Sequence, residues 1–417
     1  MNGTTTKEYF TMKKKTAHPH LEKHPPAVLF SVGHFPGFEA YAGGGAERIL
    51  ERLITAYEQY YPNRNRMHLH VGSKKKLHAR MRFSTNTTED PERVLLPQLA
   101  AEMSSSDAII HFGSTYFITH HPEQFIRIAM EWKGHIIQRV TLTSKITDLY
   151  SQHGLDVSQH ILQAIDIFIS QSAQMTKELI ALDIPEHKIV QIENGIDCVD
   201  KFPETREEKK RLRKMLLPSA QRSEVIFLYA ARLKDPIKRA DELISLWIDQ
   251  QLGDKGYTLV LAGSLISQSN TPESSLDDII RTYSREGLEK RHIFFTGLID
   301  EQKLESYYKL SDVYVTTSER EGFSNSALEA MAYGLPVIGR VGVSGHEELI
   351  IPEQTGLVFQ DTSGLLAHIE RLGNDEQLRS QLGQYARRHI EERYSIKQMV
   401  EKYMQLYDVL SRKTHST

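Results

Sequence analysis

The sequence predicts an α/β protein made of two parallel-sheet domains that face each other across a cleft. The chain has 417 residues, which is more than one hydrophobic core usually holds. In both halves, short runs rich in β-branched and aromatic residues alternate with helical patterns, as in βαβ units. Glycine-rich loops follow strands in each half, at the position where open α/β sheets bind ligands.

The composition is that of a soluble globular protein, with 40% apolar and 25% charged residues. The 51 Lys and Arg residues against 54 Asp and Glu give a net charge of −3, which argues against a nucleic-acid partner. The single cysteine, Cys198, excludes an internal disulfide and a multi-cysteine zinc site. No apolar run approaches the roughly 18 residues of a membrane span. We therefore expect a soluble, cytoplasmic protein.

The first domain is expected over residues 27–200. Residues 1–26 are basic but lack the apolar segment of a secretory signal, so they are expected to form a mobile tail. The first strand is expected at 27–32 and is followed by the glycines 43–45 and a helix from Ala46. Further strands are expected at 67–71, 107–111, 136–141, 165–170 and 189–192.

The segment Arg64–Arg82 is basic and is most simply a solvated face. A minority interpretation is a contact with an anionic acceptor or with the inner face of a membrane, which would make the protein peripheral there.

The second domain is expected over residues 201–395, after the turn signal Asn194-Gly195. Its strands are expected at 225–230, at 257–262 before Gly263, at 292–295 before Gly297, and at 312–317, with a helix near 240–249.

The stretch 318–338 is expected to hold the chemistry. A strand ends before it, and Ser326-Ala-Leu-Glu329 has the pattern of a capping box that opens a helix ending at Gly334. Glu321 and Glu329 therefore lie at the carboxyl end of a strand. Two interpretations stay open: ordinary capping with a solvated loop acid, or two carboxylates that bind sugar hydroxyls beside the free amides at the helix start.

Arg232 and Lys238 follow the strand at 225–230. A guanidinium and an ammonium placed there suit a diphosphate, although an ordinary basic loop is an equal alternative. The 43–45 glycines match neither G-x-G-x-x-G nor a P-loop, so a tight turn is also open. The 19 histidines show no H-E-x-x-H spacing and no D-x-D occurs, so we expect no catalytic metal and no cofactor.

Together these motifs resemble the retaining glycosyltransferases of the GT-B fold, family four, also called glycosyl transferases group 1. The resemblance covers roughly residues 27–395. It is carried by the 44–47 and 194–197 segments, Arg232, Lys238, Gly263, Gly297, and the run from Glu321-Gly322-Phe323 through Glu329 to Gly334-Leu335-Pro336-Val337-Ile338.

The resemblance implies a hexosyltransferase-type enzyme whose donor is a nucleotide-diphosphate sugar, with a UDP-sugar favoured over a GDP- or ADP-sugar. Arg232 and Lys238 would hold the leaving diphosphate in place of a metal, Glu321 would bind the transferred sugar, and Glu329 would bind the ribose. The other implied donor-binding residues are Gly44, Gly45, Gly263, Gly297, Gly322, Phe323, Ser324, Asn325 and Ser326. Residues 396–417 would cross back to complete the first domain.

One departure concerns the first domain. Members of the family often carry a histidine at the end of the strand that here reads 136–143, where this chain has threonines. Either His111 or a threonine near Thr143 is expected to take that place. The alternatives to a transferase are a catalytically silent GT-B partner of another transferase, and a GT-B phosphorylase or epimerase. The acceptor has no readable signal in the sequence.

Overall fold

The computed structural model of the chain describes residues 28–32, 45–61, 67–71, 108–198, 206–218, 225–265 and 275–413. The chain divides into two compact units: unit 1 comprises Met1–Gly195 and Ile396–Thr417, and unit 2 comprises Ile196–Ser395. The expected boundary after residue 200 lies outside the described residues, as do the expected tail at 1–26 and most of the segment Arg64–Arg82.

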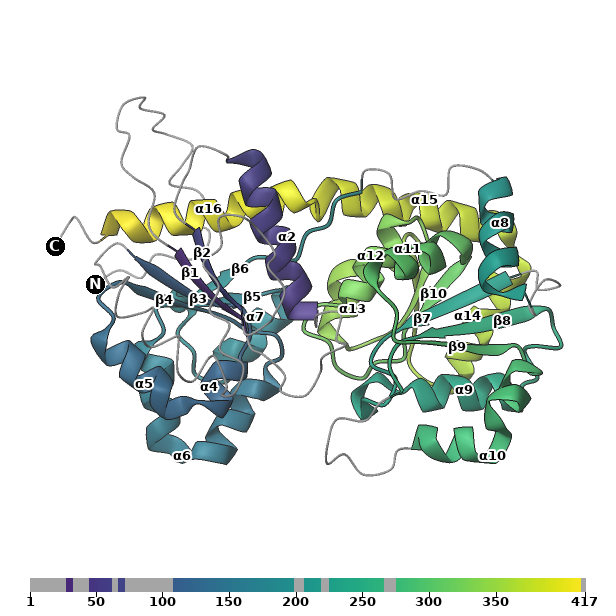
Figure 1. The fold of residues 1–417 in the computed structure, drawn as a ribbon, viewed down its shortest axis with the longest axis horizontal. Helices are drawn as coiled ribbons and strands as arrows, with labels where there is room; N and C mark the ends of the chain where they lie inside the picture. Colours follow the sequence, from purple (N-terminus) through teal and green to yellow (C-terminus); the bar gives the residue numbers. More distant parts are fainter. Residues whose placement is uncertain are drawn as a thin grey trace. The chain divides into compact units, whose positions relative to one another are not determined.

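The sheet of unit 1 has six parallel strands in the described part of the chain, in the order β2-β1-β3-β4-β5-β6 (Figure 1). Their bounds are β1 Val28–Val32, β2 Met67–Val71, β3 Ile109–Phe112, β4 His135–Arg139, β5 Ile167–Ser170 and β6 Ile189–Gln191. The central strands read as nearly continuous apolar runs because helices cover both faces of the sheet.

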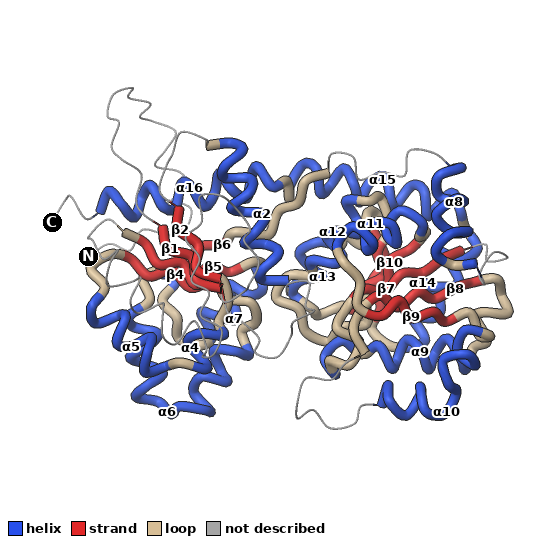
Figure 2. The backbone as a smooth tube through the Cα atoms, in the orientation of Figure 1, coloured by secondary structure: helices blue, strands red, loops and turns tan. Residues whose placement is uncertain are grey.

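On one face of this sheet lie α2 and α16, and on the other lie α4 to α7 (Figures 1 and 2). The bounds are α2 Gly45–Tyr60, α4 Tyr116–His120, α5 Pro122–Glu131, α6 Ser144–Ala164, α7 Ala173–Ala181 and α16 Ile396–Lys413, with a short 3-10 helix at Glu186–Lys188. Helix α16 packs against α2 and the strands, so the end of the chain is part of the core of unit 1. Among the described helices, none is both long and apolar enough to span a membrane.

The sheet of unit 2 also has six parallel strands among the described residues, in the order β9-β8-β7-β10-β11-β12. Their bounds are β7 Val225–Ala230, β8 Tyr257–Ala262, β9 Ile293–Gly297, β10 Val313–Val315, β11 Val337–Arg340 and β12 Gly356–Phe359. This is the strand order of a Rossmann sheet. It reverses direction between β7 and β10, the point where such sheets bind ligands at the carboxyl ends of their strands.

Helices α8, α11, α12 and α15 cover one face of this sheet, and α9, α10 and α14 cover the other (Figure 1). The bounds are α8 Arg206–Leu216, α9 Ala240–Asp249, α10 Ser275–Glu289, α11 Glu301–Leu310, α12 Asn325–Ala332, α13 Ser344–Leu349, α14 Thr362–Asn374 and α15 Glu376–Arg393, with a 3-10 helix at Pro236–Lys238. Among the described residues, helices therefore cover both faces of the sheet, which leaves the carboxyl ends of its strands as the expected ligand-binding edge.

The capping box expected at Ser326–Glu329 is wrong. Helix α12 begins at Asn325, so Ser324 is the N-cap residue, and its side chain makes no capping hydrogen bond. A capping carboxylate would then stand at position 327, so Glu329 lies two residues too far into the helix to cap it. The expected end of the helix is confirmed: Gly334 follows the C-cap residue with a φ of +72°, a conformation that favours glycine.

Candidate functional site

Lys238 and Glu321 meet at the switch point of the sheet of unit 2. Lys238 ends the 3-10 helix that follows β7, and Glu321 lies in the loop that follows β10. Lys238 Nζ lies 2.6 Å from Glu321 Oε1, and the two side chains are 17% and 14% exposed. Strands β7 and β10 are neighbours in a parallel sheet, so their carboxyl ends bring together two residues that are far apart in the sequence.

The pair keeps Glu321 ionised. Burial raises the pKa of Glu321, but the charge and hydrogen bond of Lys238, assisted by His346 and Ser318, outweigh it and lower the pKa below its ordinary value. A carboxylate accepts hydrogen bonds and an ammonium donates them. The site therefore offers an acceptor for hydroxyl groups and a cation for an anionic group within one hydrogen-bond length.

The first turn of α13 holds the main chain of Glu321. Ser344 Oγ donates a hydrogen bond of 2.7 Å to the Glu321 carbonyl, and the amide of Gly345 donates a second of 3.1 Å. A Cβ at Gly345 would lie 2.7 Å from the amide nitrogen of Ser324, closer than real Cβ contacts come. Only glycine fits there without moving the loop that carries Glu321.

The segment Gly322–Ser326 leads from Glu321 into α12. Gly322, Phe323 and Ser324 are buried, while Asn325 and Ser326 are half-buried. Ser324 Oγ is buried and makes no hydrogen bond within the described residues. A helix N-terminus attracts anions and hydroxyl acceptors through its free amides, so this segment can receive a polar ligand.

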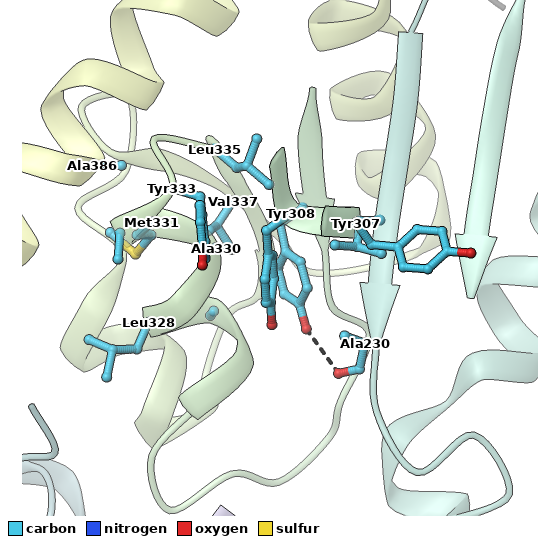
Figure 3. Packing of buried hydrophobic residues seen from close by; sticks show 14 of the residues in the cluster. Ala230, Tyr307, Tyr308, Leu328, Ala330, Met331, Tyr333, Leu335, Val337 and Ala386 are labelled. Atoms are coloured by element: carbon cyan, nitrogen blue, oxygen red, sulfur yellow. Dashed lines mark hydrogen bonds between the residues drawn. The ribbon is translucent and has the colours of Figure 1, made fainter. Parts of the chain in front are cut away.

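Glu329 lies inside the core of unit 2 and is 4% exposed. Tyr308 Oη donates a hydrogen bond of 3.0 Å to Glu329 Oε2. The rings of Tyr308 and Tyr333 stack with centroids 5.2 Å apart, side by side in the cluster that Figure 3 shows. Tyr308 was missed by the sequence analysis, because its position at the end of α11 marks it only as a core residue.

Arg232 forms a separate ion pair on the same loop. Its side chain is 47% exposed and donates a hydrogen bond of 2.6 Å to Asp235 Oδ2. Asp235 Oδ1 also accepts from the amide of Ile237 and so caps the 3-10 helix that carries Lys238. The Arg232 side chain is therefore exposed enough to contact an anion in solution. Its ion pair with Asp235 holds it beside the 3-10 helix that carries Lys238.

Two glycines keep the strand ends beside this loop close together. Gly263 has a φ of +153°, and a Cβ there would lie 1.8 Å from the carbonyl oxygen of Ala231, the residue before Arg232. The amide of Gly263 donates to the carbonyl of Gly297, which has a φ of +69°. Both conformations favour glycine, and at Gly263 the close approach of the backbone also requires it.

In unit 1, the structure places His111 in the core. His111 on β3 is completely buried, and its Nδ1 lies 2.7 Å from Tyr407 Oη on α16. Burial, reinforced by the charge of Arg139, lowers the pKa of His111 to about 3, so the ring is neutral at physiological pH. The geometry thus assigns His111 to the packing of α16 on the sheet and not to the ligand-binding edge expected from the sequence.

The carboxyl edge of this sheet is occupied by other polar groups. Thr143 Oγ1 donates a hydrogen bond of 2.6 Å to Glu178 Oε2. Arg139 at the end of β4 is buried and donates to Gln171 Oε1 at 2.8 Å and to Asn194 Oδ1 at 2.9 Å. The sequence analysis missed Arg139, although an arginine inside an apolar strand run was a usable signal. Of the first-domain glycines, Gly44 lies outside the described residues and Gly45 is the first residue of α2.

Lys238 and Arg232 supply positive charge at the switch point. Within the described ranges, no group of three His, Cys, Asp or Glu residues is placed to hold a metal ion. Lys238 and Arg232 lie on one loop, and the start of α12 lies on the loop that carries Glu321. The arrangement can therefore bind an anionic group on the side of Lys238 and hydroxyl groups on the side of Glu321.

Comparison with known proteins shows similarity to glycosyltransferases. Residues 218–389 match the family model described as Glycosyl transferases group 1. The capsular polysaccharide biosynthesis glycosyltransferase CapM of Staphylococcus aureus is 28% identical over 164 residues, covering 38% of this chain and 40% of the relative. The N-acetyl-alpha-D-glucosaminyl L-malate synthase of Bacillus anthracis is 38% identical over 105 residues, covering 24% of this chain and 27% of the relative. The chain thus spans less than half the length of these two relatives.

Solved structures share the whole fold. Anabaena Alr3699/HepE in complex with UDP-glucose aligns with a TM-score of 0.73 at 17% identity, over 93% of this chain and 100% of that chain. The sucrose-phosphate synthase of Thermosynechococcus elongatus aligns with a TM-score of 0.70 at 21% identity, with the same coverage. Most of unit 2 therefore matches the group 1 glycosyltransferases, and both units share the fold of solved GT-B glycosyltransferases.

Proposed function

We propose that this chain is a retaining glycosyltransferase that moves a hexose from a nucleotide-diphosphate sugar to an acceptor without a metal ion. The observation that carries the proposal is the Lys238–Glu321 pair, 2.6 Å apart at the switch point of the unit 2 sheet. A UDP-sugar is the favoured donor, since the structure of Anabaena Alr3699/HepE with a TM-score of 0.73 contains UDP-glucose.

The proposed chemistry follows from where charge develops. When the bond between the sugar and the diphosphate breaks, negative charge grows on the departing phosphate, and a fixed cation there lowers the barrier. Lys238 is the half-buried cation at this place, and the more exposed Arg232 adds a planar guanidinium that suits phosphate oxygens. Glu321 remains ionised beside Lys238 and accepts hydrogen bonds from hydroxyls of the transferred sugar.

The donor is identified first by thermal shift. The purified protein is heated with UDP-, GDP- and ADP-sugars, and the true donor raises the melting temperature because it binds only the folded state. Turnover of that donor is then measured, including its slow hydrolysis without acceptor. A protein that binds nucleotide sugars but never cleaves one would instead be a silent partner subunit, and dependence on inorganic phosphate would indicate a phosphorylase.

Replacing Lys238 by alanine tests the assigned chemistry. We expect Lys238→Ala to lower turnover on the order of 100-fold or more, in the range seen when a group that stabilises transition-state charge is removed. Lys234→Ala is the matched control, because Lys234 lies on the same loop but pairs with Asp277 at 2.5 Å. Wild-type turnover by a folded Lys238→Ala protein would contradict the role of Lys238.

A further inference from the structure

Two buried hydroxyl groups, those of Tyr229 and Thr317, donate hydrogen bonds to main-chain carbonyls at Lys238 and Arg239. Tyr229 Oη donates a hydrogen bond of 2.5 Å to the carbonyl of Lys238. Thr317 Oγ1 lies 3.0 Å from the same carbonyl and 2.7 Å from the carbonyl of Arg239, so its single hydroxyl proton is shared between the two. Both residues are at most 1% exposed. Tyr229 lies on β7 and Thr317 lies just after β10, and these two strands flank the switch point.

The backbone at this place needs such support. Arg239 has a φ of +52°, in the left-handed region that residues other than glycine rarely adopt. The carbonyls of Ile237 and Lys238, at the end of the 3-10 helix, accept hydrogen bonds from donors outside that helix. The amide of Glu319 supplies one for the carbonyl of Ile237, at 2.9 Å. Arg239 and Glu319 also form an ion pair.

The donors therefore come largely from one short segment. Thr317 and Glu319 together bond to three successive carbonyls, those of Ile237, Lys238 and Arg239. Two residues beyond Glu319, the same segment carries Glu321, whose carboxylate meets Lys238 Nζ. One stretch of chain thus holds Lys238 at its main chain and at its side chain.

We propose that Thr317, with Tyr229, is a positioning residue that sets Lys238 for the leaving diphosphate. The inference rests on the proposed function, because it concerns the placement of the cation that function requires. Displacement of a catalytic group by about 1 Å costs on the order of 100-fold in rate, so a lysine on a long flexible side chain depends on a fixed main chain.

The test compares Thr317→Val, which keeps the shape and removes the hydroxyl, with Thr317→Ser, which keeps the hydroxyl. We expect Thr317→Val to lower kcat on the order of 10- to 100-fold with a smaller change in the donor KM, and Thr317→Ser to stay within about threefold of wild type. Tyr229→Phe should lower kcat in the same direction. Tyr257→Phe is the matched control. Tyr257 is the first residue of β8, and the hydroxyl that this change removes donates to Asn374 at the end of α14, away from Lys238.

All rates are measured well below the melting temperature of each variant, so that loss of fold is not mistaken for loss of positioning. If Thr317→Val does not fold, Tyr229→Phe supplies the same comparison. Wild-type kcat in Thr317→Val with only a lower melting temperature would show a merely structural hydroxyl and overturn the proposal. Equal losses in Thr317→Val and Thr317→Ser would point to packing and would also overturn it.

Lys238→Ala separates this inference from the proposed function. If Lys238→Ala is fully active, the assigned role of Lys238 is wrong, whatever Thr317 does. If Lys238→Ala is inactive and Thr317→Val is unimpaired, the proposed function stands and the positioning role is wrong. Support for both requires loss of kcat in Lys238→Ala, Thr317→Val and Tyr229→Phe, with activity retained in Thr317→Ser.

Discussion

At the scale of single residues, the ion pair of Lys238 and Glu321 links stability to pH. The pKa of Glu321 is lowered in the folded protein, so folding favours its ionised form. The resulting stabilisation is fully present above the unfolded-state pKa of about 4.3 and is lost as the pH falls through the lower folded-state pKa. The melting temperature of Glu321→Gln should therefore lie below that of the wild type at pH 7, and the gap should shrink as the pH falls below about 4.

A matched control for this prediction is Glu370→Gln. Glu370 also pairs with a lysine, Lys255, but both side chains are about 40% exposed, and exposed pairs contribute roughly 0–1 kcal/mol. Its melting temperature should follow that of the wild type across the same range. A gap for Glu321→Gln that persists unchanged at low pH would show that the carboxylate charge is not what stabilises the loop.

At the scale of elements, α13 is expected to set the loop of Glu321 by close contact. A methyl group at Gly345 would press against Ser324 and Glu321, so Gly345→Ala should displace the loop and lower turnover at least about tenfold. Gly364→Ala, in the first turn of α14, is the control. Its nearest atom would lie 3.5 Å from the new methyl, an ordinary contact. Steady-state kinetics of both variants with the identified donor make the comparison.

An active Gly345→Ala protein would mean that the loop tolerates the shift. Gly364→Ala should retain activity and gain slightly in melting temperature, since alanine is favoured over glycine within a helix by roughly 0.5–1 kcal/mol. Both glycines lie in the first turn of a helix. A difference in turnover between Gly345→Ala and Gly364→Ala therefore reports the close contact of the new methyl group with Ser324, and not the general effect of replacing glycine by alanine.

Elements of this protein differ in how far the sequence reveals them. The strands at 225–230 and 257–262 were predicted residue for residue, and the helix expected near 240–249 was found there, because buried strands and amphipathic helices show in local patterns. The capping box predicted at Ser326–Glu329 was wrong, although the local sequence has the right pattern. The carboxylate of Glu329 accepts a hydrogen bond from Tyr308, which lies on another helix. Local motifs cannot reveal such a competing partner.

At the scale of the whole molecule, the site depends on contacts between distant parts of the chain. The sequence placed Arg232, Lys238 and Glu321 at strand ends, but only the strand order of unit 2 makes β7 and β10 neighbours and joins Lys238 to Glu321. For His111 the strand was predictable and the hydrogen-bond partner was not, since Tyr407 lies 296 residues away on α16. Neither pairing has a local signal from which it could be read.

Helix α16 provides the last prediction, because it belongs to unit 1 although it follows all of unit 2 in the chain. Val400 is completely buried against the sheet of unit 1, whereas Lys397 on the same helix is exposed. Val400→Asp buries a carboxylate there and should destabilise unit 1 by more than about 3 kcal/mol. Lys397→Asp places the same side chain in water and should leave stability nearly unchanged.

Unit 2 has hydrophobic clusters of its own, so its unfolding should be little affected by Val400→Asp. Calorimetry should then show one transition moved to lower temperature and the other in place, and the donor should still raise the second, because its proposed binding residues lie in unit 2. Turnover should be lost in Val400→Asp and kept in Lys397→Asp. A single transition that moves as a whole would mean that the two units unfold together, and α16 would then stabilise the entire molecule.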